Sequence, residues 1–142
     1  MNNEIIELLR TIANSFQMRM KEQIVSNDSG LSAFQARLIN IIGRNDGIAQ
    51  LTLGLLTERD KAQIARAINE LETAGFVTRS LNEADKRSKC LTLTAAGVEM
   101  HLQLNAIRGQ LAIEALSSLS NDEKHALHAS LQKVATKLIT QN

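Results

Sequence analysis

The sequence predicts a mainly α-helical fold with a small β wing, and three observations lead to this fold class. The chain has 142 residues with no proline and only seven glycines, which favours long helices over a loop-rich fold. Aromatic residues make up only 2% of it, so the core must consist of Leu, Ile and Ala. Apolar residues recur at helical spacing except in residues 76–94, where they alternate as in strands.

Residues 4 to 25 are predicted to form a long amphipathic helix. Its apolar stripe runs over about six turns and consists of Ile5, Leu8, Leu9, Ile12, Phe16, Met20 and Ile24. A turn composed of Ser, Asn, Asp, Ser and Gly follows at residues 26–30. The next helix begins after Ser32, whose spacing to Gln35 fits a capping box, and ends near residues 43–47.

Residues 47–94 predict helix, turn, helix and then a two-stranded hairpin. The short first helix, from about residue 49 to 56, is rich in leucine, and either Thr57 or Asp60 can cap the helix after it. That second helix ends at Gly75, where a left-handed cap is expected. Its buried stripe is Ile64, Ile68 and Leu71, and its opposite face carries Ala62, Arg66, Asn69 and Thr73.

The predicted hairpin forms a wing with a charged tip. One strand starts at Phe76 and Val77, and the other alternates apolar and smaller residues through Leu91 and Leu93. The tip, residues 82–89, has three basic residues within four positions. Such a tip is ordinarily a solvated hairpin end.

Two further helices are predicted after the wing, from Ala95 to about Ser118 and after a capping box at Ser120 and Glu123. The last helix has apolar residues at alternating four- and three-residue steps, which suits a partner helix. With the N-terminal helix, these elements hold more apolar surface than one such core needs, and the surplus favours a homodimer. The alternative is that they pack on their own domain.

Several motifs in combination resemble the winged helix-turn-helix of the MarR family of transcriptional regulators. They are Asp60-Lys61-Ala62 to Arg66, Leu71-Glu72 to Gly75-Phe76-Val77, Arg79, Asp85-Lys86-Arg87, and Leu93-Thr94 to Gly97. The resemblance implies one MarR-like domain over residues 1–142, with a DNA-binding lobe at 31–97 and dimerisation helices at 1–25 and 98–142. The chain departs from the family pattern in its leucine-rich short helix and in the turn at Glu58 and Arg59, so the register of that turn stays open by a residue or two.

The expected function is that of a sequence-specific regulator that binds double-stranded DNA as a homodimer at a pseudo-palindromic operator, as a ligand-responsive repressor. The second helix of the motif fits the major groove, and the wing can follow the backbone into the minor groove. The resemblance implies that Arg87 enters the minor groove and that Asp85 holds it. The predicted DNA-binding residues are Lys61, Ala62, Gln63, Arg66, Asn69, Asp85, Lys86, Arg87 and Lys89. The sequence does not select between repression and activation.

Structural alternatives stand beside this interpretation. Arg66 could pair with Glu70 one turn later, and Asp85 could be a turn residue. The formal net charge is only +1, which is compatible with DNA binding but does not by itself indicate it. The alternative function is a winged-helix protein-interaction module without specific DNA binding, which would use the leucine-rich helix and the C-terminal seam.

Family members often bind small phenolic or anionic effectors between the dimerisation helices and the DNA-binding lobe. In this chain the pocket would involve helices 4–25 and 32–43 and the start of the helix after the wing. The sequence leaves open whether an effector exists. Phe16 and Phe34 could stack on one, but both fit a core role better.

Other functions find little support in the sequence. The single cysteine, Cys90, excludes an internal disulfide and fits a structural role in a wing strand better than redox sensing. His125 and His128 fall short of the three or four ligands that zinc needs, so we predict no metal and no cofactor. No catalytic constellation indicates an enzyme. Without a signal peptide or an apolar run of membrane length, we expect a cytoplasmic protein with no membrane partner.

Overall fold

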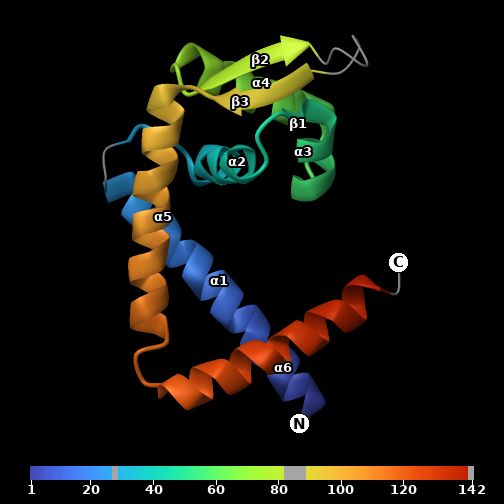
Figure 1. The fold of residues 1–142 in the computed structure, drawn as a ribbon, viewed down its shortest axis with the longest axis vertical. Helices are drawn as coiled ribbons and strands as arrows, with labels where there is room; N and C mark the ends of the chain where they lie inside the picture. Colours follow the sequence, from blue (N-terminus) through green and yellow to red (C-terminus); the bar gives the residue numbers. More distant parts are fainter. Residues whose placement is uncertain (27–28, 82–88, 141–142) are drawn as a thin grey trace. The chain divides into compact units, whose positions relative to one another are not determined.

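The computed structural model describes residues 1–26, 29–81 and 89–140. Contacts divide the chain into two compact units, residues 1–108 and residues 109–142, and the boundary lies within one helix. The elements follow one another as α1 (Asn2–Ser26), α2 (Ala33–Arg44), β1 (Ile48–Ala49), α3 (Gln50–Thr57), α4 (Lys61–Thr73), β2 (Val77–Leu81), β3 (Lys89–Leu93), α5 (Ala95–Ala115) and α6 (Asn121–Ile139) (Figure 1).

The first unit contains an antiparallel sheet in the order β1-β3-β2. The predicted hairpin is confirmed: β2 pairs with β3 from Val77 opposite Leu93 to Leu81 opposite Lys89. The sheet also has a third strand, because Ile48 of β1 pairs with Leu91. The sequence pattern does not indicate β1, since two residues are too few to show an alternation.

The core of this unit lies between the helix-turn-helix and the sheet. The predicted buried stripe of α4 is confirmed, because Ile64, Ile68 and Leu71 are at most 2% exposed. Burying side chains of this size stabilises a fold by about 1.5–3 kcal/mol each. The fully buried side chains come from five elements and are Leu38, Ile39, Ile42, Leu53, Ile64, Ile68, Leu71, Val77 and Leu91.

The turn between α3 and α4 settles which residue caps α4. Asp60 is the N-cap, and its side chain accepts a hydrogen bond from the Gln63 backbone N–H. Thr57 is buried in α3 instead, where its hydroxyl donates to the Leu53 carbonyl at 2.6 Å. Glu58, between them, is the one non-glycine residue with a positive φ in the described ranges, at 55°. This left-handed residue ends α3 sharply enough for α4 to begin three residues later.

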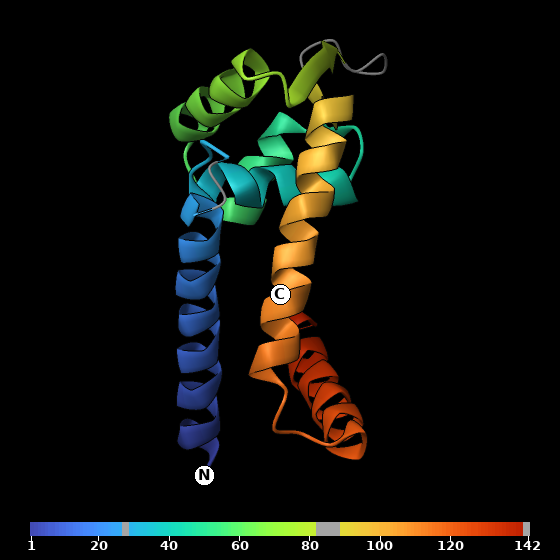
Figure 2. The ribbon, with the colours of Figure 1, turned by 90° about the vertical axis from the view of Figure 1, so that its left-hand side faces the viewer.

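The long α1 helix joins the lobe at its C-terminal end. Met20 and Ile24 are buried there, whereas Ile5, Leu8 and Ile12 are 47% to 61% exposed. Figure 2 shows α1 as one continuous helix whose C-terminal end meets the rest of the first unit. About half of the predicted apolar stripe of α1 is therefore exposed in a single chain.

The second unit consists of the end of α5, a turn and α6. The predicted capping box is confirmed: the Glu123 N–H donates to Ser120 Oγ at 3.2 Å, and the Ser120 N–H donates to Glu123 Oε1 at 3.0 Å. Leu111 is buried, but no residue of α6 is. Across the described residues, none of the helices is long and apolar enough to pass through a membrane.

Candidate nucleic-acid interface

The α4 helix turns one face to the core and leaves the other exposed. Four of its residues are buried, at positions 64, 67, 68 and 71. All of the predicted DNA-binding residues on α4 are exposed, namely Lys61, Ala62, Gln63, Arg66 and Asn69. The amphipathic pattern thus places these five side chains on a surface that a DNA groove could approach.

At the start of α4, the Gln63 side chain folds back onto the N-cap. The Asp60 carboxylate accepts from the Gln63 N–H at 2.8 Å, and Gln63 Oε1 accepts from the Asp60 N–H at 3.4 Å. This reciprocal capping box satisfies two N–H groups that the first turn would otherwise leave unpaired. It uses the oxygen of the Gln63 amide, and the hydrogen bonds within the described ranges include none from the NH₂ group.

In the third turn of α4, Asn69 is held by the wing. Arg79 of β2 donates from Nη2 to Asn69 Oδ1 at 2.5 Å, and the same nitrogen lies 3.5 Å from the Ala65 carbonyl. Arg79 Nε is buried and has no hydrogen-bond partner. The Arg79 side chain therefore joins the wing strand to the exposed face of α4. The sequence motif contains Arg79, but its spacing gives no sign of this contact.

Glu70, on the flank of α4, is held by α2. The Gln35 side chain donates from Nε2 to Glu70 Oε2 at 2.6 Å. Gln35 also accepts from the Ser32 N–H at 2.9 Å, as part of the predicted capping box of α2. The alternative that Arg66 pairs with Glu70 finds no support, because the ion pairs of the described residues do not include Arg66.

Of the DNA-binding residues predicted on the wing, Lys89 is the one that lies within the described residues. Lys89, at the start of β3, is exposed. It lines a groove of about 780 Å³ together with Lys61 of α4. Leu51 and Leu55 of α3 line the same groove and are 61% and 75% exposed. The other three predicted residues of the wing tip, Asp85, Lys86 and Arg87, lie outside the described residues.

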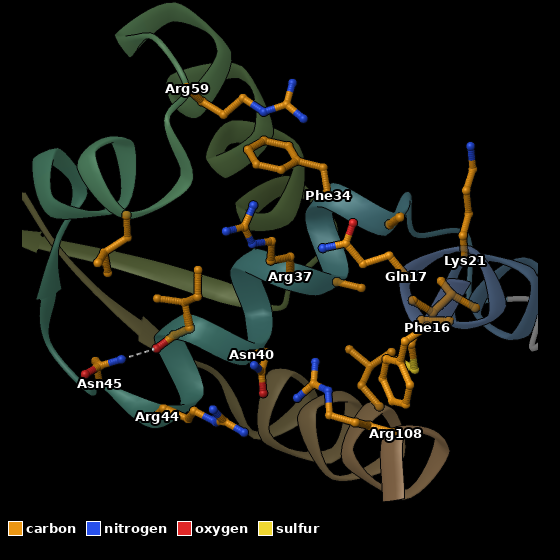
Figure 3. Close-up of a pocket in the computed structure, with 17 residues that line it drawn as sticks. Phe16, Gln17, Lys21, Phe34, Arg37, Asn40, Arg44, Asn45, Arg59 and Arg108 are labelled. Carbon is orange, nitrogen blue, oxygen red and sulfur yellow. Dashed lines mark hydrogen bonds between the residues drawn. The ribbon is translucent and has the colours of Figure 1, made fainter. Parts of the chain in front are cut away.

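A second hollow of about 660 Å³ lies between α1, α2, the end of α3 with the turn after it, and the middle of α5 (Figure 3). The α5 residues that line it, Leu104 and Arg108, lie in the third and fourth turns of that helix rather than at its start, where the sequence placed the pocket. Five cationic side chains line it, namely Lys21, Arg37, Arg44, Arg59 and Arg108, and none of the described lining residues is acidic. Phe16 and Phe34 provide apolar surface. Asn40 is only 9% exposed, and its Oδ1 has no hydrogen-bond partner. This cavity can accept an anion that also donates a hydrogen bond.

His101 lies where α5 crosses α2. Gly43 allows this close approach, since a Cβ atom at that position would lie 2.6 Å from the imidazole Cδ2. Burial lowers the pKa of His101 below its ordinary value, and the positive charges of Arg44 and Arg108 lower it further. Burial also lowers the pKa of Arg108, with a second contribution from Arg44. The His101 pKa is thus lowered mainly by burial, and in smaller part by two arginines that line the cavity.

The remaining candidate groups of the sequence lie apart. Cys90 is half-buried in β3, opposite Ser80 of β2. His125 Nδ1 lies 2.7 Å from the Asn121 carbonyl in its own helix. Within the described part of the chain, no three or more His, Cys, Asp or Glu side chains gather closely enough to hold a metal ion.

The chain is similar in sequence to transcriptional regulators. A sequence model described as MarR family matches residues 29–88. The HTH-type transcriptional regulator BilQ of Clostridium symbiosum (strain WAL-14163) is 31% identical over 105 residues, which are 74% of this chain and 73% of that protein.

Solved structures show the same fold. A MarR transcriptional regulator from Methanosarcina mazei Go1 superposes with a TM-score of 0.84 at 24% identity, covering 99% of each chain. A MarR family transcriptional regulator from Listeria monocytogenes, complexed with 26mer DNA, superposes with a TM-score of 0.79 at 22% identity and covers 96% of this chain and 89% of that one.

Proposed function

Because the chain belongs to the MarR family of DNA-binding transcriptional regulators, we propose that it binds a pseudo-palindromic operator as a homodimer and represses transcription until an anionic effector binds. The observation that carries the proposal is the exposed polar face of α4, held between the sheet and α2. A helix presented in this way fits the major groove of duplex DNA. A DNA-binding regulator of this kind is not an enzyme, and we expect it to act in the cytoplasm.

The predicted residues have separate roles in this proposal. Arg66 and the amide groups of Gln63 and Asn69 contact base edges, and Ala62 leaves room for a base to approach. Lys61 and Lys89, which share one groove, contact phosphates on either side of the bases. From the wing tip, Arg87 enters the minor groove with Asp85 as its support, and Lys86 contacts the backbone. The structural relative complexed with 26mer DNA supports DNA binding by a protein of this fold.

Exposed apolar side chains support the homodimer. Leu127, Leu131 and Val134 of α6 are 37% to 40% exposed, and Leu138 is 67% exposed. The N-terminal part of α1 carries a second exposed apolar stripe. Apolar surface of this extent is unusual on a monomer and typical of surfaces that a second copy buries. Two copies would place two α4 helices about one helical turn of DNA apart.

The cationic cavity supports the effector. Its five positive side chains without a described carboxylate favour an anion, and the unpaired Asn40 oxygen favours an anion that carries a hydroxyl or amino donor. Effector binding would change the preferred position of α4 and thereby the affinity for DNA. Repression would follow from occlusion of a promoter.

Selection from a random duplex library at physiological salt tests the proposal. Enrichment of an inverted repeat, with affinity that falls steeply as salt rises, would support an operator-binding homodimer. The rival function, a protein-interaction module, is favoured by the exposed Leu51 and Leu55 of α3. A folded protein that enriches no sequence, and whose retention on duplex DNA changes little with salt, would support this rival. An apolar protein interface releases few counterions, so it gives no steep salt dependence.

Binding of small molecules tests the effector part separately. We expect 4-hydroxybenzoate to weaken operator binding in a fluorescence anisotropy assay, and the neutral 4-hydroxybenzamide to have no effect. Arg108→Gln should reduce the response to the anion. Its matched control is Arg10→Gln on exposed α1, where Arg10 pairs with Glu7 outside the cavity. Equal responses of both variants would contradict a role for the cavity.

A further inference from the structure

We propose that α4 recognises its operator chiefly through hydrogen-bond donors and therefore selects base pairs by their major-groove acceptors, above all those of guanine. The inference rests on the proposed function, in which α4 enters the major groove, and it goes further by naming the base chemistry that α4 accepts. It follows from the atoms of the exposed side chains that are already hydrogen-bonded within the lobe.

Asn69 supplies the first step. A guanidinium group has only donors, so the amide atom that faces Arg79 must be the oxygen. The NH₂ group of Asn69 then points away from Arg79. Recognition of adenine by asparagine needs both amide atoms, because Oδ1 accepts from adenine N6 while Nδ2 donates to N7. While Arg79 holds the oxygen, this pair would require Oδ1 to accept a second hydrogen bond, so Asn69 offers chiefly its donor.

Gln63 supplies the second step by the same logic. Its amide oxygen accepts from the Asp60 N–H in the capping box, so its NH₂ group is the part that remains for DNA. The Asp60 carboxylate is directed back to the Gln63 backbone N–H through Oδ1. The first turn of α4 thus uses its side-chain acceptors to close its own N-terminus.

Glu70 supplies the third step. A carboxylate on a recognition helix would accept from cytosine N4, as other DNA-binding proteins do with Glu or Asp. Here Gln35 of α2 holds Glu70 Oε2 at 2.6 Å, and Ser32 in turn holds the oxygen of Gln35. This chain of contacts holds one carboxylate oxygen of Glu70 against α2, in a hollow that Arg66 also lines.

Lys61 and Arg66, which are also exposed on α4, carry donors only, whereas the hydroxyl of Thr73 in the last turn can accept as well as donate. In the major groove, guanine presents two acceptors, O6 and N7, and thymine presents O4. Adenine sets a donor, N6, beside its N7 acceptor, and cytosine presents only a donor. A helix that presents mainly donors therefore gains most at guanine and has few groups that could accept from the adenine N6 or cytosine N4 amino groups.

Base analogues in the selected operator test this inference directly. Replacing a guanine that contacts α4 by 7-deazaguanine removes the N7 acceptor and should weaken binding about fivefold, the effect of losing one hydrogen bond. Replacing an adenine by purine removes the N6 amino group and should leave the dissociation constant unchanged within about twofold, since a twofold change is well below the worth of one hydrogen bond. The same replacements outside the half-sites control for effects on the duplex itself.

A matched pair of variants tests the role of Arg79. Arg79→Met keeps the length of the side chain but removes its donors, so the Asn69 amide becomes able to pair with adenine. Repeating the selection with this variant should give a new adenine preference at one base pair of each half-site. Arg79→Lys keeps a donor and should retain the preference of the parent. Because the result is a change of preferred base, a general loss of affinity or stability in either variant does not imitate it.

Two results would overturn the inference while leaving the proposed function intact. One is a loss of affinity of more than about fivefold, the worth of a full hydrogen bond, when an adenine N6 amino group facing α4 is removed. The other is an Arg79→Met variant, shown by circular dichroism to be folded, that selects the same bases as the parent. Failure of the parent to enrich any sequence would instead overturn the proposed function, and the inference with it.

Discussion

The guanidinium of Arg59 lies over the ring of Phe34, with its Cζ atom 4.6 Å from the ring centroid. Arg59 belongs to the turn that directly precedes the N-cap of α4, whereas Phe34 lies in α2. Both side chains line the cationic cavity (Figure 3). A bound anion would attract the Arg59 guanidinium away from the Phe34 ring. Because Arg59 directly precedes α4, this attraction would act on the start of the recognition helix.

We predict that Phe34→Leu retains operator binding but responds less to an anionic effector than the parent. The reason is that Leu has no ring face with which to hold Arg59 between the cavity and α4. Phe34→Tyr keeps the ring and should respond like the parent. The measurement is the ratio of operator dissociation constants with and without 4-hydroxybenzoate. A Leu variant with the parent's ratio would exclude this contact from the response.

Substitutions at Arg66 and Arg87 should have different effects on DNA binding. Arg87→Ala should weaken binding to all sequences and reduce the salt slope by about 1, as expected for the loss of one positive charge from the minor groove. Arg66→Ala should in addition relax the preference at specific base pairs, at a cost of about 1–3 kcal/mol against the best operator. Arg10→Ala, on exposed α1, is the control. If both variants bound duplex DNA as the parent does, these two site assignments would be wrong.

Two glycines of α5 should respond in opposite ways to alanine. A Cβ atom at Gly97 would collide with the Phe76 carbonyl oxygen, whereas a Cβ at Gly109 would meet no atom within 4 Å. Gly97→Ala should therefore lower the free energy of unfolding by about 2–3 kcal/mol, because a backbone atom has to move. Gly109→Ala should raise it by about 0.5–1 kcal/mol through helix propensity. Urea denaturation of both variants tests this, and equal midpoints would contradict the close packing at Phe76.

His101 should make the fold sensitive to mild acid. Its pKa is lowered in the folded state, so as the pH falls below about 6.5 the unfolded chain binds more protons than the folded chain. The free energy of unfolding is then largest above this pH and decreases towards lower pH. His101→Gln should flatten this dependence between about pH 5 and 7, within the range where histidine titrates. A melting temperature that falls equally in both proteins over this range would assign the effect to other groups.

The architecture of the lobe could be predicted from the sequence because its signals are local. The period of the apolar residues distinguishes α4 from the wing, and Ser120 with Glu123 marks the start of α6. The sequence alone allows either Thr57 or Asp60 as the N-cap of α4, since both residue types cap helices well. Only the packing decides it, because Thr57 is 5% exposed and bonds within α3.

The polar contacts that shape the interface could not be predicted in the same way. Arg79 is 10 residues from Asn69, and Gln35 is 35 residues from Glu70. No periodic pattern links such positions, because the contacts exist only after the sheet and α2 have packed on α4. The sequence therefore indicates which side chains are exposed on α4, but not which of their atoms remain unpaired.

The junction at Gly97 has a mechanical consequence. Thr94 donates from its N–H to the Phe76 carbonyl at 3.0 Å and from its hydroxyl to the Gly75 carbonyl, directly beyond the end of α4. Together with the close approach of Gly97 to Phe76, these bonds fix the first turn of α5 to the segment between α4 and β2. The rest of α5 can then tilt as a unit about this turn. The part from Ala95 to Arg108 is about 20 Å long at 1.5 Å per residue, so a tilt of about 5° displaces its far end by roughly 2 Å. A displacement of that size at Arg108, transmitted along α5, would therefore rotate the sheet and the C-terminal end of α4.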